Sequence, residues 1–155
     1  MLRSLEDVAN ATPKDYLAHV PKDAMLMAQK MIGTARQKNP IPNIDDGKER
    51  FQNYDFLYVG PGSGLVVQNL IQLGQAAFGM ETSKRGIKYG SPDEIRSYVL
   101  WAKPWESPFA FAEHKKPFHV GILSDYYKKI LTPEEWKETV AEMKRICRYI
   151  AVFKE

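Results

Sequence analysis

Three glycines carry the most specific chemical pattern in this 155-residue chain. Gly60, Gly62 and Gly64 follow a short apolar run, 56–59, and an amphipathic segment begins directly after them. This order predicts a strand, a tight turn and a helix. At such a turn, backbone N–H groups lack partners within the helix, and the positive end of the helix dipole lies beside them. The turn therefore predicts a site for a negatively charged group, or for a ligand that needs close approach of the backbone.

An acidic side chain lies at the expected distance from this turn. Glu81 ends a second apolar run, 76–80, and 81 − 60 = 21 positions separate it from Gly60. An acid about 20 residues after the first glycine can bind the ribose hydroxyls of a nucleotide cofactor. The glycines are spaced G-x-G-x-G, whereas the dinucleotide pattern G-x-G-x-x-G would place its third glycine at Leu65.

Together, the glycine spacing and the acid resemble the class I, or Rossmann-like, S-adenosylmethionine (SAM) dependent methyltransferases. The words F-G-M-E-T-S-K-R-G-I are similar to that family's second-strand motif, and the resemblance spans residues 54–155. It implies SAM as the cofactor. The cofactor-binding residues that it implies lie in the glycine turn and at the ends of the second, third and fourth strands: Gly60, Pro61, Gly62, Gly64, Glu81, Thr82, Ala102, Lys103 and Ser124.

The candidate catalytic residues are Asp125 and Tyr127, in the sequence S-D-Y-Y that follows the fourth predicted strand. A carboxylate at the carboxyl end of a strand faces the ligand crevice, so Asp125 is a candidate general base or substrate anchor. The alternative is that it caps the next helix. Amino-directed members of the family have two prolines and a final aromatic residue here, and S-D-Y-Y shares only the tyrosine. No histidine–cysteine grouping has the spacing of metal ligands, so no metal is expected.

Two positions depart from the family pattern. Tyr58 stands two residues before the first glycine, where the family usually has an acid. The third strand is followed by Ala102-Lys103-Pro104, without the acid that often binds the adenine amino group. Trp101 or Trp105 is a candidate to stack on adenine instead, and packing of either ring within the protein is the alternative.

The elements that position these residues predict an α/β fold. Residues 1–155 form one domain, with an N-terminal helical segment, 1–53, and a cofactor-binding core, 54–155. Helix starts are expected at Ser4, Thr12-Pro13 and Pro21, and a loop over 39–50. The core predicts a three-layer, Rossmann-like domain with a mostly parallel five-stranded sheet in the order 3-2-1-4-5. The ligand crevice is then expected between strands 1 and 4.

The fifth strand predicts an interaction surface. The family's sheet has seven strands, with an antiparallel hairpin after the fifth, and this chain has room for five. An uncovered apolar edge strand invites pairing with another chain. We therefore expect a second subunit (a homodimer or a partner chain), the N-terminal helices, or both to cover this edge.

Composition limits the classes of function. The formal net charge is only +3 and there is one cysteine, Cys147, so no intramolecular disulfide is possible. No apolar run is long enough to span a membrane, and the N-terminus lacks a signal-peptide core, so a cytoplasmic protein without membrane contact is expected. A nucleic-acid partner is unlikely on this charge. The basic residues Lys84, Arg85 and Lys88 form either a solvated helix face or a contact for an anionic substrate.

Three hypotheses remain open from the sequence. The first is a SAM-dependent methyltransferase acting on a small molecule. The second is a non-catalytic relative that binds SAM or serves as a partner subunit. The third is a nucleotide- or nucleic-acid-binding module.

Overall fold

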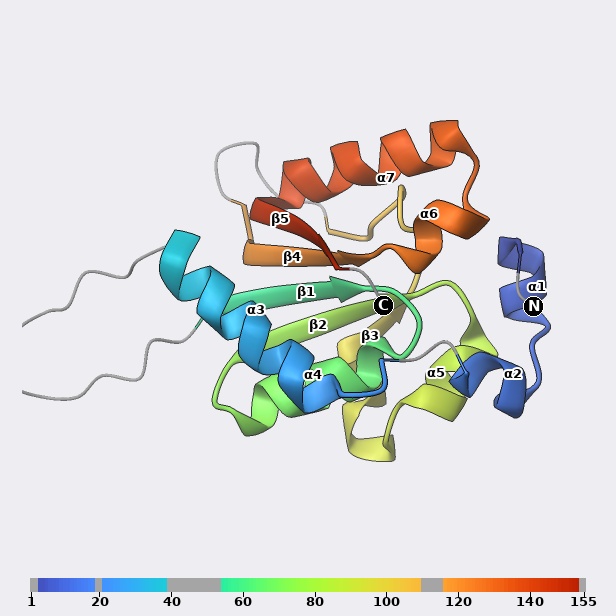
Figure 1. Ribbon diagram of the computed structural model, residues 1–155, viewed down its shortest axis with the longest axis horizontal. Helices are drawn as coiled ribbons and strands as arrows, with labels where there is room; N and C mark the ends of the chain where they lie inside the picture. The colour runs from blue at the N-terminus through green and yellow to red at the C-terminus, as the bar shows by residue number, and fades with distance from the viewer. Residues whose placement is uncertain (1–2, 19–20, 39–53, 110–115, 154–155) are drawn as a thin grey trace, which may run out of the picture.

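A parallel five-stranded sheet forms the centre of the molecule (Figure 1). The structure is a computed structural model that describes residues 3–18, 21–38, 54–109 and 116–153. The strands lie in the order β3-β2-β1-β4-β5, and each neighbouring pair is parallel. The predicted strand order is therefore confirmed. The strands are β1 (Asp55–Val59), β2 (Ala76–Glu81), β3 (Val99–Trp101), β4 (Phe118–Ser124) and β5 (Cys147–Phe153).

Helices cover both faces of the sheet, which confirms the three-layer Rossmann-like α/β fold (Figure 1). On one face lie α3 (Ala24–Lys38) and α4 (Ser63–Gln72), and on the other lie α6 (Tyr126–Ile130) and α7 (Pro133–Ile146). Alternate residues of β1 enter the two cores. Phe56 and Tyr58 pack with α3 and α4, whereas Leu57 and Val59 pack with α6 and α7. This burial on both faces accounts for the continuous apolar runs of the central strands.

Two short helices, α1 (Leu5–Ala9) and α2 (Pro13–Leu17), lie beyond the carboxyl ends of the strands, beside α5 (Lys84–Gly90) (Figure 1). The side chain of Thr12 caps α2 by accepting a hydrogen bond from the Asp15 N–H at 3.2 Å, and Pro13 occupies the first helical position. Ser4 caps α1 in the same way. These caps are the predicted ones, and they place the N-terminal segment over the end of the sheet at which the candidate site lies.

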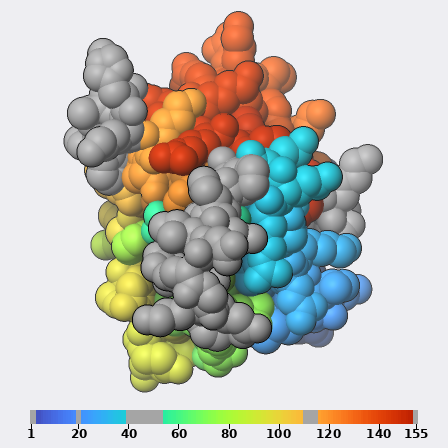
Figure 2. Space-filling view, turned by 90° about the vertical axis from the view of Figure 1, so that its left-hand side faces the viewer, coloured from blue at the N-terminus to red at the C-terminus, as the bar shows by residue number. Residues whose placement is uncertain are grey.

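The third N-terminal helix covers a different part of the sheet. Figure 2 shows α3 beside the C-terminal segment, and the ammonium group of Lys38 lies 5.2 Å from the ring centre of Tyr149 in β5. Within the described residues, β5 pairs only with β4. This contact lies on one face of the sheet, so cover of the outer edge of β5 by the N-terminal helices stays a prediction. A second subunit at this edge stays a prediction.

Some local details differ from the sequence prediction. The strong helix start at 91–94 leads into a 3₁₀ helix, η1 (Asp93–Tyr98), rather than an α-helix. The loop expected over 39–50 lies outside the described residues. Among the helices that the structure describes, none has both the length and the apolar character needed to cross a bilayer.

Candidate functional site

The glycine turn connects β1 to α4, as predicted. Gly62 precedes α4 with φ 74° and ψ 21°, a left-handed conformation that side-chain-bearing residues rarely adopt. Gly60 is needed for close packing instead. A Cβ atom on Gly60 would lie 2.6 Å from the Cβ of Ser124, so β4 can approach the turn only because this side chain is absent.

Ser124 is buried against this turn. Its hydroxyl accepts a hydrogen bond from the backbone N–H of Tyr126 at 3.3 Å, and the residue is 1% exposed. The described contacts of Ser124 are therefore with the protein itself, and they hold the end of β4 against Gly60.

Glu81 lies where β2 ends and is 1% exposed. One carboxylate oxygen, Oε1, accepts hydrogen bonds from the backbone N–H groups of Thr82 at 3.0 Å and Ser83 at 3.3 Å. Burial raises the pKa of Glu81 to about 7, against the opposing effect of these hydrogen bonds and of one from Tyr16. A buried carboxyl group whose pKa lies near 7 is typical of functional sites.

The second oxygen of Glu81 is bound by a residue of the N-terminal segment. Tyr16, from α2, donates its phenolic hydrogen to Glu81 Oε2, and the same hydroxyl oxygen accepts the N–H of Gly62 at 2.8 Å. We call this arrangement of Gly62 and Glu81 the glycine corner. The corner is therefore closed by the protein's own side chain, which the sequence analysis did not predict.

The candidate catalytic residue Tyr127 reaches the same region from α6. Its hydroxyl lies 3.4 Å from the hydroxyl of Thr82, and its side chain is fully buried. Burial and the nearby carboxylate of Glu81 raise the pKa of Tyr127 well above its usual value. Its phenol is therefore neutral near pH 7 and is available for hydrogen bonds.

Asp125, the other candidate catalytic residue, lies where β4 ends, two strands away from Glu81 in the sheet. Its backbone N–H donates to the carbonyl of Phe153 in β5 at 3.0 Å. The residue precedes α6, but its side chain does not cap that helix. The alternative helix-capping role thus has no hydrogen bond to support it.

A half-exposed aromatic rim lies beside Glu81. Trp101 is the partner of Glu81 in the pairing of β2 with β3, and its indole N–H donates to the carbonyl of Thr82 at 3.1 Å. The ring is 59% exposed, and the ammonium group of Lys84 lies 4.3 Å from its centre. Lys103 is exposed and lies near the ring of Trp105 at 5.9 Å. Trp101, rather than Trp105, is therefore the tryptophan anchored next to the glycine corner.

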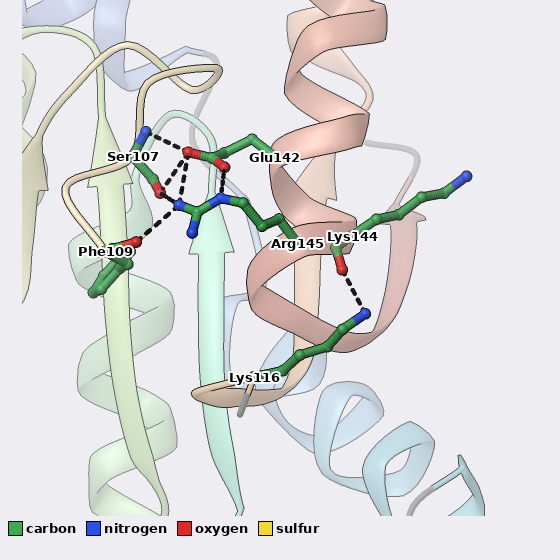
Figure 3. Close-up of polar contacts among 6 residues, drawn as sticks. All are labelled: Ser107, Phe109, Lys116, Glu142, Lys144 and Arg145. Atoms are coloured by element: carbon green, nitrogen blue, oxygen red, sulfur yellow. Dashed lines mark hydrogen bonds and ion pairs between the residues drawn. The ribbon is translucent and has the colours of Figure 1, made fainter. Parts of the chain in front are cut away.

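The segment after β3 is held against α7 by polar contacts (Figure 3). Ser107 donates its backbone N–H at 3.0 Å and its hydroxyl at 2.9 Å to Glu142. Arg145 forms an ion pair with Glu142 and donates to the carbonyl of Phe109 at 2.8 Å. We call Ser107, Glu142 and Arg145 the α7 clamp. The clamp fixes the segment that follows β3. No local sequence pattern indicated it.

The structure thus brings together only part of the predicted site. Gly62, Glu81, Thr82 and Tyr127 meet around Tyr16, and Ala102 stands next to them through a backbone hydrogen bond to the Glu81 carbonyl at 3.1 Å. Gly60 and Ser124 pack on each other, and Gly64 packs against Ser91. Within the described residues, no group of three or more His, Cys, Asp or Glu side chains is arranged to hold a metal ion.

Solved structures share this fold. The SAM-dependent methyltransferase from Aquifex aeolicus aligns with a TM-score of 0.57 and 13% identity, over 92% of this chain and 72% of the other. The CcbJ methyltransferase from Streptomyces caelestis gives a TM-score of 0.57 and 13% identity, over 96% and 55%. The glycopeptide N-methyltransferase MtfA, complexed with S-adenosylhomocysteine (SAH), gives 0.53 and 15%, over 84% and 50%.

This chain has the fold of the class I SAM-dependent methyltransferases. It spans about half the length of MtfA. No protein-family model and no curated protein matches the sequence.

The hydrogen-bonding pattern at the glycine corner fits a nucleoside. The atom between Gly62 and Glu81 must accept a hydrogen bond from an N–H and donate one to a carboxylate. A hydroxyl group does both, and the hydroxyl of Tyr16 does so here. A phosphate or carboxylate lacks the hydrogen to donate and would be repelled by ionised Glu81. The corner is therefore chemically suited to the hydroxyl of a sugar.

Proposed function

We propose that the protein is a SAM-dependent methyltransferase that acts on a small-molecule acceptor. The single observation that carries the proposal is the buried Glu81 carboxylate beside the Gly62 N–H, in a sheet of methyltransferase order. SAM is the ligand of this fold that has a ribose with free hydroxyls and an adenine ring, and the similar structures include a SAM-dependent methyltransferase and an N-methyltransferase complexed with SAH.

Each part of the corner has a role in this proposal. Bound SAM would supply a methyl group on a sulfonium that leaves as a neutral thioether. Glu81 accepts hydrogen bonds from the ribose hydroxyls, and Gly62 donates its N–H to one of them. Trp101 offers an aromatic face, which suits the adenine ring. Thr82, Ala102 and Lys103 border the same side.

The acceptor side of the proposal rests on β4 and α6. Asp125 accepts the proton that the acceptor atom loses, and it orients that atom. Tyr127, held neutral by burial, contributes a hydrogen bond from its phenol. Because the neutral thioether formed from a sulfonium is already a good leaving group, alignment of the acceptor supplies most of the rate acceleration. A histidine or cysteine nucleophile is not required.

A ligand-binding experiment tests the proposal. Isothermal calorimetry with SAM, SAH and NAD should show binding of SAM and SAH by the wild-type chain. Glu81→Ala should weaken that binding markedly. Glu106→Ala is the matched control, because Glu106 is an exposed acid on the loop after β3. Binding of NAD alone would overturn the proposal, and unchanged SAM affinity in Glu81→Ala would remove Glu81 from the site.

The second candidate is a non-catalytic relative that binds SAM or acts as a partner subunit. The closed state of the corner favours the partner-subunit form of this candidate, since Tyr16 occupies the hydrogen-bonding position that a sugar needs. Transfer of radiolabelled methyl from SAM to a panel of small amines, alcohols and carboxylic acids separates the two. Binding of SAM without transfer to any acceptor would favour this candidate.

A further inference from the structure

The side chain of Tyr16 fits the glycine corner along its whole length. The ring packs against two glycines of α5, since a Cβ on Gly86 would lie 2.5 Å from the ring and one on Gly90 would lie 3.0 Å from it. The hydroxyl then reaches Gly62 and Glu81. Tyr16 is 1% exposed, so water does not share this position. Both ends of the side chain are therefore held by specific contacts.

These contacts occupy both carboxylate oxygens of Glu81 with hydrogen bonds from the protein itself. Oε1 receives the N–H groups of Thr82 and Ser83, and Oε2 receives the hydroxyl of Tyr16. The N–H of Gly62 is also taken by Tyr16. A sugar hydroxyl would need the same donor and the same acceptor. Two oxygen atoms cannot occupy one position, so the sugar and Tyr16 exclude each other.

We propose that Tyr16 is an internal competitor of the cofactor: its hydroxyl occupies the sugar-hydroxyl position between Gly62 and Glu81, and a nucleoside enters only when α2 leaves. This inference rests on the proposed function for the identity of the ligand. It adds a step to that function, because the N-terminal segment must open before the cofactor binds. The apparent affinity is then reduced by the fraction of molecules that are open.

The architecture of the N-terminal segment suits such an opening. Each of α1 and α2 has five residues, and isolated helices of that length are unstable in water. The part of the segment that carries α1 and α2 is held to the core through the buried residues Val8, Ala11 and Tyr16. Release of α2 therefore breaks a few contacts at the end of the sheet and leaves the strands and the α7 clamp in place.

The test compares SAH affinity in three variants with that of the wild type. Tyr16→Phe keeps the ring on Gly86 and Gly90 but removes the hydroxyl, so Oε2 of Glu81 loses this donor in the closed state. Loss of a hydrogen bond to a charged group destabilises the closed state relative to the open one. We therefore expect about a tenfold gain in SAH affinity. Thr12→Ala removes the cap of α2 and should give a smaller gain of the same sign.

The matched control is Tyr89→Phe. The ring of Tyr89 meets that of Tyr16 edge to face at 6.2 Å, so this variant removes a neighbouring phenolic hydroxyl and keeps the ring contact. Its SAH affinity should equal that of the wild type. Weaker or unchanged SAH binding in Tyr16→Phe would overturn the inference, because a competitor cannot be removed without benefit to the ligand.

Hydrogen exchange measured without ligand distinguishes a failure of this inference from a failure of the proposed function. Amides of residues 12–18 should exchange about tenfold faster in Tyr16→Phe than in the wild type or in Tyr89→Phe. Exchange as slow as in the wild type would overturn the inference, whether or not SAH binds. Absence of SAH binding in every variant, with faster exchange in Tyr16→Phe, would overturn the proposed function while leaving the hold of Tyr16 on α2 established.

Discussion

The hydroxyl of Tyr16 donates a hydrogen bond to the carboxylate of Glu81 across 65 positions of sequence. This contact joins the N-terminal segment to the acid at the end of β2. The same hydroxyl also accepts a hydrogen bond from the Gly62 N–H. Because the carboxyl is buried, its protonation state and the position of α2 depend on each other. The free energy of unfolding should therefore depend on the protonation state of Glu81.

Glu81 predicts a pH dependence of folding. Its pKa in the folded protein is about 7, above the 4.5 of an ordinary glutamate, so the folded state binds the proton more tightly than the unfolded state. The contribution of Glu81 to the free energy of unfolding is then highest below pH 4.5, falls as the pH rises toward 7, and levels above it. The fall amounts to about 3 kcal/mol. Urea unfolding between pH 4 and 8 measures it.

Glu81→Gln should remove this fall, since the amide does not titrate. The titratable groups that face Glu81 are Tyr16 from α2 and Tyr127 from α6, and burial holds both phenols neutral over this range. Glu106→Gln, an exposed control, should retain the wild-type slope. Equal slopes in the wild type and Glu81→Gln would mean that Glu81 does not carry the raised pKa.

The close approach of Gly60 to Ser124 predicts a specific pair of mutational effects. Gly60→Ala places a methyl group 2.6 Å from the Cβ of Ser124 and 3.2 Å from the ring of Tyr58, so it should destabilise by about 1–3 kcal/mol. Adding Ser124→Gly removes the first of these atoms and should restore part of the loss. Thermal unfolding of both variants measures the rescue.

Gly33→Ala is the control for this pair. Gly33 lies inside α3, and nothing is within 4 Å of the position that a Cβ would take. Alanine should therefore stabilise the helix by up to about 1 kcal/mol. A Gly60→Ala variant as stable as Gly33→Ala would contradict the packing argument at the turn.

Much of the fold was predictable because it depends on local patterns. Apolar runs marked the strands, the Thr12-Pro13 pair marked α2, and glycine spacing marked the turn. The position of Glu81 at the end of β2 was predictable because the distance from a glycine turn to the next strand end is nearly constant in this architecture. These signals lie within about 20 residues, which is the range over which a sequence pattern is informative.

The missed features are long-range and made by ordinary residues. Tyr16 lies on a five-residue helix and looks like any amphipathic position, yet it binds a residue 65 positions away. The burial of Ser124 against Gly60 depends on how closely β1 and β4 approach, and its role at the cofactor site stays a prediction. A glycine-rich α5, with Gly86 and Gly90, was the one available hint that a ring lies on that helix.

Trp101 predicts an optical signal for binding. The ring is 59% exposed and is tied to Thr82, the neighbour of Glu81. A nucleoside held by Glu81 should alter the fluorescence of this indole. Titration with SAH should therefore change the emission of the wild type, and Trp101→Phe should lose most of that change. Trp136→Phe, on α7, should retain it; a signal that survives in Trp101→Phe would place the base elsewhere.

The α7 clamp predicts a measurable coupling between distant residues. Glu142 accepts two hydrogen bonds from Ser107, and its side chain is only 12% exposed, so the interaction is partly shielded from solvent. Burial raises the pKa of Glu142, but the bonds from Arg145 and Ser107 outweigh it and hold the pKa below its usual value. A double-mutant cycle with Ser107→Ala and Glu142→Ala should give a coupling of about 1 kcal/mol. The exposed pair of Asp93 and Arg96, at 2.8 Å, is the comparison and should give less than about 0.5 kcal/mol. Equal coupling in the two pairs would mean that the clamp is a surface contact and does not hold the segment after β3.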